Sequence, residues 1–206
     1  MTQTPRPVEL FVDPVCPFAW ITSRWILNAT QVREIAPTFS NMSLSVLNEG
    51  RDLPADYAEG MKKAWGPARL ALAITQQHGS DAFARWYTAW GERFHVQGDH
   101  DHRAVAEEAL AEADLPADLI DTFDGSGDQL EADLRASQAH AQSMVGDDVG
   151  TPVISFGEGV AYFGPVLGRA PKGEDAGRLF DAMADLASIE GLYELKRART
   201  QGLDFS

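Results

Sequence analysis

A single cysteine, Cys16, is the residue of this chain best suited to chemistry, and it lies between a short apolar segment and a proline. Residues 8–12 are mostly apolar and predict a buried strand, which ends at the turn signal Asp13-Pro14. Pro17 suits the first turn of a helix, where its missing N–H costs nothing. The pattern therefore places Cys16 at or next to a helix N-terminus.

The start of a helix favours a negative charge, because its backbone N–H groups are unpaired and the helix dipole is positive there. For a cysteine this charge is the thiolate, which is the nucleophilic form. We therefore expect Cys16 to be a reactive thiol with a lowered pKa. Asp13 acts in the opposite direction, since a nearby negative charge disfavours the thiolate. The alternative is that Cys16 is a small buried hydrophobic residue, as most free cysteines are.

The stretch that begins at Cys16 resembles a known redox motif. Cys16-Pro17-Phe18-Ala19 resembles the Cys-x-x-Cys motif of the thioredoxin superfamily, with Ala19 in place of the second cysteine. Residues 13–25 resemble the actinobacterial DsbA-like proteins that are grouped as mycothiol-dependent nitroreductases. Other segments also resemble that family, so that the similarity spans nearly the whole chain: Leu47-Asn48-Glu49, Ala64-Trp65-Gly66-Pro67, Gly150-Thr151-Pro152, Phe163-Gly164-Pro165-Val166 and Glu194-Leu195-Lys196-Arg197.

Length, composition and charge limit the class of protein. A chain of 206 residues with 44% apolar residues is expected to form one domain, or one domain with an insertion. The net charge of −14 argues against binding nucleic acid, whose phosphates attract lysine and arginine. We expect no signal peptide and no membrane span, because no apolar run is long enough. One cysteine excludes an intramolecular disulfide, so we expect a cytoplasmic protein.

The hydrophobic periodicity predicts a strand–helix–strand unit followed by a long helical region. The first strand is expected at residues 8–12, the helix from about Pro17 to Ile35, and the second strand from Phe39 to Leu47, before a polar loop at residues 48–54. In the helical region we expect a helix with a break or kink at Gly66-Pro67, an aromatic-faced helix at residues 83–94, and three more helices at residues 104–113, from 115 and at 129–145. The aromatic stripe is expected to be core packing and not a platform for a cofactor.

The last part of the chain predicts a hairpin and a closing helix. Strands at residues 153–156 and 160–163 are joined by Gly157-Glu158-Gly159, and a helix follows at residues 174–189. Together with the resemblance, this order predicts an α/β fold of the thioredoxin-like (DsbA-like) type. The core is expected at residues 1–54 and 146–206, and residues 55–145 are expected to be a helical insertion domain between its βαβ and ββα halves.

Thr151-Pro152 is the expected second half of the active site. The resemblance implies a cis-proline opposite the reactive cysteine, which would leave the backbone of Thr151 free to hold a thiol substrate in an extended form. The alternative is an ordinary proline at the start of a strand, where it cannot donate to a ladder. The full set of expected substrate-binding residues is Pro17, Trp20, Asn48, Tyr57, Thr151 and Pro152.

Trp65 and His95 are weaker candidates for the site, because each is equally consistent with packing or loop structure. The segment His95 to His102 holds three histidines and two aspartates, but their spacing fits no common structural zinc pattern. We expect a solvated loop there and no metal. Gly125-Ser126-Gly127 and Gly157-Glu158-Gly159 lack the context of a phosphate loop, so no nucleotide cofactor is expected.

The absence of a second cysteine shapes the expected mechanism. A mixed disulfide on Cys16 must be resolved by an outside thiol, and the resemblance implies that this thiol is mycothiol. We expect an oxidoreductase whose partners are a small-molecule thiol and an oxidised disulfide or nitroaromatic substrate, with a homodimer left open. One alternative is an enzyme like kappa-class glutathione transferase or 2-hydroxychromene-2-carboxylate isomerase. The other is a non-catalytic redox-sensing or binding protein.

Overall fold

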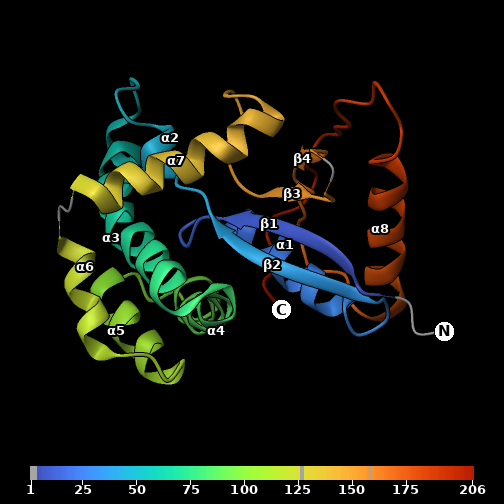
Figure 1. The fold of residues 1–206 in the computed structure, drawn as a ribbon. Coiled ribbons are helices and arrows are strands. Elements are labelled where there is room, and N and C mark those ends of the chain that lie inside the picture. Colours follow the sequence, from blue (N-terminus) through green and yellow to red (C-terminus); the bar gives the residue numbers. More distant parts are fainter. Residues whose placement is uncertain (1–3, 126–127, 158) are drawn as a thin grey trace.

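A mixed four-stranded sheet with the order β2-β1-β3-β4 lies at the centre of the computed structural model (Figure 1). The parallel pair is β1 (Arg6–Val12) and β2 (Ile35–Asn41), whose register sets Arg6 opposite Ile35. Strand β3 (Val153–Ser155) runs antiparallel to β1, and β4 (Ala161–Phe163) runs antiparallel to β3. The structure describes residues 4–125, 128–157 and 159–206, so Ser126, Gly127 and Glu158 lie outside it.

Two helices complete the unit around this sheet. Helix α1 (Pro17–Ala29) makes the crossover between β1 and β2, and α8 (Gly173–Leu186) follows the β3–β4 hairpin and packs against α1. The order βαβ and then ββα is the thioredoxin-like topology that the resemblance implied. The predicted fold class is confirmed.

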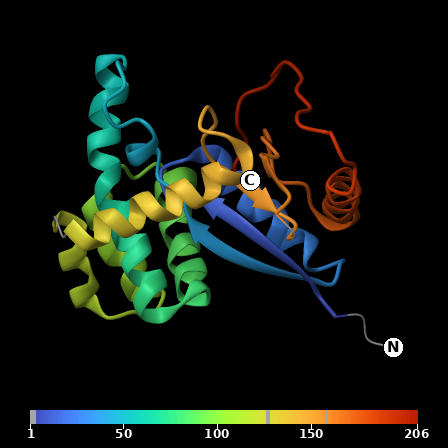
Figure 2. The same ribbon diagram turned by 45° about the horizontal axis from the view of Figure 1, so that its top comes forward.

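The remaining helices lie between β2 and β3 in the sequence and gather beside one end of the sheet (Figures 1 and 2). They are α2 (Leu44–Leu47), α3 (Ala55–His78), α4 (Ser80–Gly91), the π-helical turn η1 (Glu92–Gln97), α5 (His102–Glu112), the 3-10 turn η2 (Ala117–Ile120), α6 (Asp121–Asp124) and α7 (Asp128–Val145). Helix α7 runs back from this cluster to β2 and β4 (Figure 2). The division into a core and an insertion domain at residues 55–145 stays a prediction.

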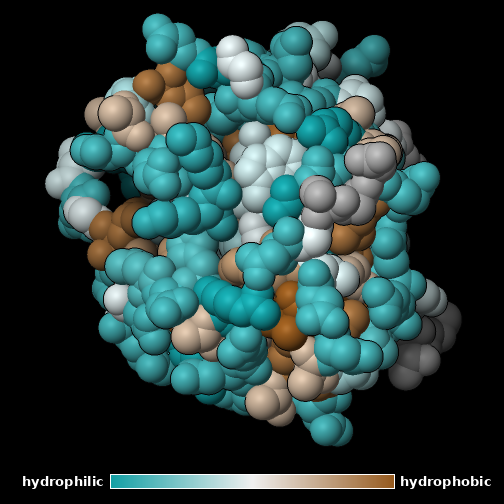
Figure 3. All heavy atoms as spheres, turned by 90° about the vertical axis from the view of Figure 1, so that its left-hand side faces the viewer, coloured by the Kyte–Doolittle hydropathy of each residue, from teal (hydrophilic) through white to brown (hydrophobic). Residues whose placement is uncertain are grey.

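The aromatic face of α4 is buried in the main core. Phe83, Trp86, Tyr87 and Trp90 are each 0% exposed and share one cluster with residues of the sheet and of α1, which confirms the packing prediction. The opposite, outer face of the helical region is covered mostly by hydrophilic side chains, with isolated hydrophobic ones between them (Figure 3). None of the described helices combines the length and the apolar character needed to cross a bilayer.

The second strand and the first helix end earlier than predicted. Helix α1 ends at Ala29, and Ile35 already belongs to β2 through its pairing with β1. Residues 44–47 form the helical turn α2 and not the end of a strand. The apolar alternation there was misleading, because the hydroxyl of Ser43 accepts a hydrogen bond from the Val46 N–H at 3.3 Å and caps a helix.

Helix α3 continues through Gly66 and Pro67, so of the predicted break or kink the break does not occur. A proline inside a helix leaves the carbonyl four residues earlier without its usual partner. Here that carbonyl belongs to Lys63, and the Nδ1 atom of His102 contacts it at 3.2 Å. Gly66 gives space to Phe123, because a Cβ atom at residue 66 would lie only 2.3 Å from that ring. Contacts from distant residues therefore keep the helix continuous.

Candidate active site

Cys16 is the N-cap residue of α1, as the sequence predicted. Its backbone is extended (φ −82°, ψ 113°), and its Sγ atom accepts a hydrogen bond from the N–H of Ala19 at 3.4 Å. Pro17 occupies the first turn of the helix. The sulphur and residue 19 therefore share one helical turn, as the Cys-x-x-Ala interpretation requires.

The Thr151-Pro152 peptide bond is cis, and it lies against the cysteine. The Cys16 thiol donates a hydrogen bond to the carbonyl oxygen of Thr151 at 3.5 Å. The prediction of a cis-proline across from Cys16 is confirmed. The hydroxyl of Thr151 is buried and has no hydrogen-bond partner among the described residues.

The expectation of a lowered thiol pKa is wrong in direction. Burial raises the pKa of Cys16, whose side chain is only 4% exposed. The side chain of Thr151 and the N–H of Ala19 lower this pKa by less than burial raises it, and the charge of Asp13 raises it further. The helix start does stabilise the thiolate, but removing the sulphur from water costs more.

Asp13 fixes the loop that presents the cysteine. Its carboxylate is fully buried and accepts one hydrogen bond from the N–H of Val15 at 2.8 Å and one from the N–H of Leu44 at 2.7 Å. Burial raises the pKa of Asp13 to about 6, and the two backbone N–H groups lower it by less. Asp13 thus joins the Cys16 loop to the start of α2.

The next residue, Pro14, is held by the helical region. Its carbonyl oxygen accepts hydrogen bonds from Trp90 Nε1 at 2.9 Å and from His95 Nε2 at 2.9 Å. A carbonyl can only accept, so His95 carries its proton on Nε2. Burial lowers the pKa of His95 to about 4, which keeps the ring neutral at physiological pH. His95 therefore positions the loop, and its ring also stacks on Trp20 with 5.8 Å between the centroids.

Asn48 and Tyr57 lie next to each other, and their role in the site stays a prediction. The Asn48 Nδ2 atom donates to the carbonyl of Leu44 at 2.9 Å and to the Tyr57 hydroxyl at 3.4 Å. A Cβ atom at Gly150 would lie 3.2 Å from the Leu44 side chain, so α2 packs against the loop that carries Thr151. Helix α2 is therefore joined to the Cys16 loop through Asp13 and packs against Gly150, the residue before Thr151.

Trp20 and Trp65 occupy different surroundings. Trp20 is 1% exposed and lies within the main core, so it presents little surface to an open groove. Trp65 lies between the guanidinium groups of Arg69 and Arg135, at 5.1 and 5.4 Å, and packs in a separate cluster of α3 and α7. These contacts make Trp65 a packing residue of the helical region, and none of them links it to Cys16.

The histidine-rich segment is only partly the loop that was expected. Its first residues belong to the π-helical turn η1, and His95 and His102 each contact a backbone carbonyl. Within the described ranges, no group of three or more histidine, cysteine or carboxylate side chains is placed to share a metal ion.

Sequence reasoning missed how Asp13 and Pro14 anchor the loop. An aspartate directly after a strand and before a proline commonly accepts from the N–H two residues on, which is the contact found with Val15. That signal was present in the sequence. The partners Leu44, Trp90 and His95 lie 31, 76 and 81 residues away from their contacts, so local patterns could not identify them.

Several solved structures share this fold. The cytosolic disulfide reductase DsbM from Pseudomonas aeruginosa aligns with a TM-score of 0.55 and 18% identity over 87% of this chain and 99% of that chain. The oxidoreductase DsbA from Xylella fastidiosa aligns with a TM-score of 0.51 and 18% identity over 89% and 88%. A 2-hydroxychromene-2-carboxylate isomerase aligns with a TM-score of 0.57 and 12% identity over 87% and 94%. At these identities the similarity establishes a DsbA-like thioredoxin fold alone.

Sequence comparison adds the family. The protein Rv2286c of Mycobacterium tuberculosis (strain ATCC 25618 / H37Rv), described as uncharacterized, is 28% identical over 194 residues, which cover 94% of this chain and 82% of that protein. Residues 15–197 match the sequence profile of a family described as "Mycothiol-dependent nitroreductase Rv2466c". The chain therefore belongs to the Rv2466c-like family and is a thiol-dependent oxidoreductase.

Proposed function

We propose that this enzyme reduces disulfide or nitroaromatic substrates through Cys16, and that mycothiol restores the cysteine in the cytoplasm. The contact between the Cys16 sulphur and the carbonyl of Thr151 at 3.5 Å is the observation that carries the proposal. It sets the only sulphur nucleophile of the chain against the backbone of a cis-proline loop. An oxidised sulphur held by Thr151 would lie within reach of this nucleophile.

The proposed cycle has two exchange steps. The Cys16 thiolate attacks one sulphur of the substrate disulfide, so that a mixed disulfide forms and the other sulphur leaves as a thiolate. A mycothiol thiolate then attacks the substrate sulphur of the mixed disulfide and releases the Cys16 thiolate. The net reaction converts one substrate disulfide and one thiol into a free substrate thiol and a new disulfide. Reduction of a nitro group to a nitroso group would consume two thiols and yield one disulfide and water.

The surroundings of Cys16 affect both steps. The N–H of Ala19 and the side chain of Thr151 lower the pKa of the thiol by less than burial raises it, and a thiolate with a raised pKa leaves more slowly. Burial raises the pKa of the free thiol overall, so the rate of the first attack is expected to increase with pH through the neutral range. Thr151, Pro152 and Pro17 would contact the substrate, with Asn48 and Tyr57 at its side.

The single cysteine also favours a second candidate function. In an enzyme of the transferase or isomerase type, the reacting thiol belongs to a bound small molecule and Cys16 would only position it. Product analysis separates the two functions, because a redox change gives a disulfide, whereas addition to carbon gives a thioether or an isomer.

Substitution Cys16→Ser tests the proposal. We expect it to abolish thiol-dependent turnover while the circular dichroism spectrum stays unchanged, because serine is nearly isosteric with cysteine. Ser45→Ala, which removes a hydroxyl that donates to the carbonyl of Met61, is the matched control for a side-chain loss near α2. Retained turnover in Cys16→Ser would contradict the proposal and favour chemistry by the thiol of a bound molecule.

A further inference from the structure

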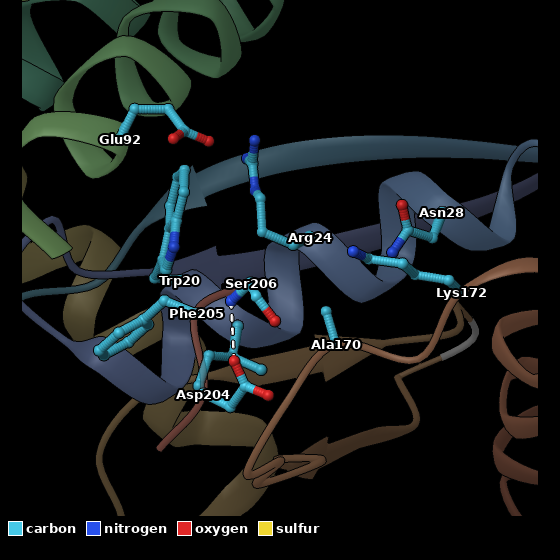
Figure 4. A pocket seen from close by; sticks show the side chains of 10 residues that line it. Trp20, Arg24, Asn28, Glu92, Ala170, Lys172, Asp204, Phe205 and Ser206 are labelled. Atoms are coloured by element: carbon cyan, nitrogen blue, oxygen red, sulfur yellow. Dashed lines mark hydrogen bonds between the residues drawn. The ribbon is translucent and has the colours of Figure 1, made fainter. Parts of the chain in front are cut away.

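Residues 193–206 follow α8 and form neither a helix nor a strand. Among the described residues, one backbone hydrogen bond joins this stretch to another segment, from the N–H of Asp204 to the carbonyl oxygen of Gly168 at 2.8 Å. The side chain of Tyr193 is 88% exposed. Residues 199–206, which we call the strap, lie beside the first turns of α1 (Figure 4).

The strap contacts two aromatic rings on either side of the cysteine. The guanidinium carbon of Arg199 lies 4.4 Å from the centroid of the Phe18 ring, which belongs to the third residue of the Cys-Pro-Phe-Ala motif. The ring of Phe205 lies 6.0 Å from the ring of His95, which holds the carbonyl of Pro14. Phe18 follows the cysteine and Pro14 precedes it, so the strap reaches both sides of the reactive loop.

A cavity of about 170 Å³ lies between the strap and α1 (Figure 4). Trp20 and Arg24 line it from the helix, and Asp204 and Ser206 line it from the strap. In Figure 4 the ring of Phe205 lies below that of Trp20. Protein interiors hold few voids larger than a water molecule, whose share of liquid volume is about 30 Å³. The strap is therefore packed less closely on α1 than a core segment would be.

The strap is also the least firmly attached neighbour of the cysteine. Cys16 is only 4% exposed, so some part beside it has to move before a reactant reaches the sulphur. The loop of Thr151 and helix α2 are tied to the reactive loop by buried hydrogen bonds to Cys16 and Asp13. Lifting the strap breaks one backbone hydrogen bond and two ring contacts at the surface. Segments with few buried contacts open at the lowest free energy.

We propose that the strap closes the Cys16 side of the molecule when no reactant is bound, and that it lifts to admit one. Arg199 and Phe205 are the two side chains that hold it closed. The family profile matches residues 15–197, so the strap lies beyond the residues that define the family. The inference concerns access to the thiol, so it goes beyond the proposed function and applies to any reaction of Cys16.

Modification of Cys16 by a bulky disulfide measures how often the strap is open. Dithiodipyridine is a neutral aromatic disulfide; the Cys16 thiolate attacks one of its sulphurs, so that a mixed disulfide forms and thiopyridone leaves, which is followed by its absorbance. Cys16 is the one cysteine of the chain, so a single site reacts. Where opening and closing are faster than modification, the rate constant is proportional to the open fraction.

Two substitutions loosen the strap. We expect Arg199→Ala to raise the rate constant about threefold, the equivalent of one exposed cation–π contact. Phe205→Ala removes a half-buried ring, and we expect about a tenfold increase. The matched controls are Arg197→Ala and Tyr193→Ala, which remove an exposed cation and an exposed ring from the preceding stretch and should leave the rate constant unchanged.

The direction of the change separates an open strap from a change of charge. Loss of a nearby cation would by itself disfavour the thiolate and slow the modification, whereas an open strap speeds it. Urea titrations of the same variants exclude general loosening, because we expect Arg199→Ala, at an exposed residue, to keep the free energy of unfolding of the unaltered protein.

Three results would overturn the proposal. They are unchanged or slower modification in both strap variants, equal acceleration in the two controls, and an acceleration that only accompanies a fall in the free energy of unfolding. The measurement needs neither mycothiol nor turnover, so it gives its answer even where the proposed function fails.

Discussion

Asp13 and Pro14 are neighbours in the loop before Cys16, yet different regions of the molecule hold them. The carboxylate of Asp13 accepts from backbone N–H groups of its own loop and of α2. The carbonyl of Pro14 accepts from Trp90 and His95, which belong to the helical region. Asp13 is a buried acid with a pKa of about 6, and His95 is a half-buried imidazole with a pKa of about 4. The cysteine is therefore positioned jointly by its own loop with α2 and by α4 with η1.

The contributions of Asp13 and His95 to folding stability change with pH in opposite directions. The pKa of Asp13 is higher in the folded state than its usual value of 3.8, so the folded state binds more protons between pH 4 and 6 and loses stability as the pH rises. The pKa of His95 is lower than its usual value of 6.5, so the unfolded state binds more protons between pH 4 and 6.5. Stability from the His95 side is therefore gained as the pH rises. The two effects offset each other in the unaltered protein, and only variants separate them.

A disulfide inside the first turn of α1 would be a third anchor for Cys16. Of the substitutions considered, it should change the surroundings of Cys16 most. Ala19→Cys puts a second thiol in the turn where the Ala19 N–H already contacts the Cys16 sulphur at 3.4 Å. We expect mild oxidation to remove both free thiols within one chain, because residues at this spacing lie within disulfide range. A free-thiol count measures this. Ala29→Cys, at the other end of α1, is the control that keeps both thiols; two free thiols in oxidised Ala19→Cys would contradict the shared turn.

Loss of the Trp90 side chain should remove one of the two hydrogen bonds that hold the carbonyl of Pro14. Its side chain is 0% exposed and donates to the Pro14 carbonyl, so Trp90→Ala leaves a cavity and removes a hydrogen bond. We expect the free energy of unfolding to fall by about 4 kcal/mol in denaturant titrations. Trp65→Ala, at a partly exposed packing residue, should cost clearly less. Equal losses would mean that Trp90 has no special part in holding the loop.

Substitution Asp13→Asn isolates the acidic anchor. Asparagine keeps one acceptor oxygen but does not titrate. As the pH rises from 4 to 7, we expect the unaltered protein to lose up to about 3 kcal/mol of unfolding free energy relative to this variant. Urea titrations across that range measure the difference. A constant difference would show that Asp13 is already ionised at pH 4.

His95→Phe isolates the basic anchor and should show the opposite slope. Phenylalanine retains a ring against Trp20 but cannot donate to Pro14 or take up a proton. Over the same pH rise, we expect the unaltered protein to gain up to about 3 kcal/mol relative to His95→Phe. The same urea titrations apply. If the stability difference from the unaltered protein changes with pH in the same direction for Asp13→Asn and His95→Phe, the opposite pH dependence assigned to the two residues is wrong.

The smallest effect should come from the cap of α2, the turn to which Asp13 is joined. Ser43→Ala removes the hydroxyl that accepts from the Val46 N–H. We expect a loss of about 1 kcal/mol in thermal or urea unfolding. Ser188→Ala, which removes an exposed hydroxyl after α8, is the control and should have little effect. No loss at Ser43 would indicate that Asp13 alone holds α2.

The parts of the fold that local chemistry determines were predictable from the sequence. Pro17 and the apolar run before Asp13 identified the helix start at Cys16, and the aromatic spacing in residues 83–94 identified a buried helix. The continuity of α3 was not predictable, because it depends on His102 meeting the carbonyl that Pro67 leaves free. The pKa of Cys16 was misjudged for a similar reason, since its burial results from the packing of distant segments and not from the motif.

Intact-mass spectrometry of the unaltered protein and of Cys16→Ser tests the central claim most directly. Each protein is exposed to oxidised mycothiol and then to an excess of reduced mycothiol. The mechanism predicts one mycothiol adduct on the unaltered protein, its rapid loss on addition of reduced mycothiol, and no adduct on Cys16→Ser. An unaltered protein that forms no adduct, or one that keeps its adduct in excess thiol, would contradict turnover through Cys16.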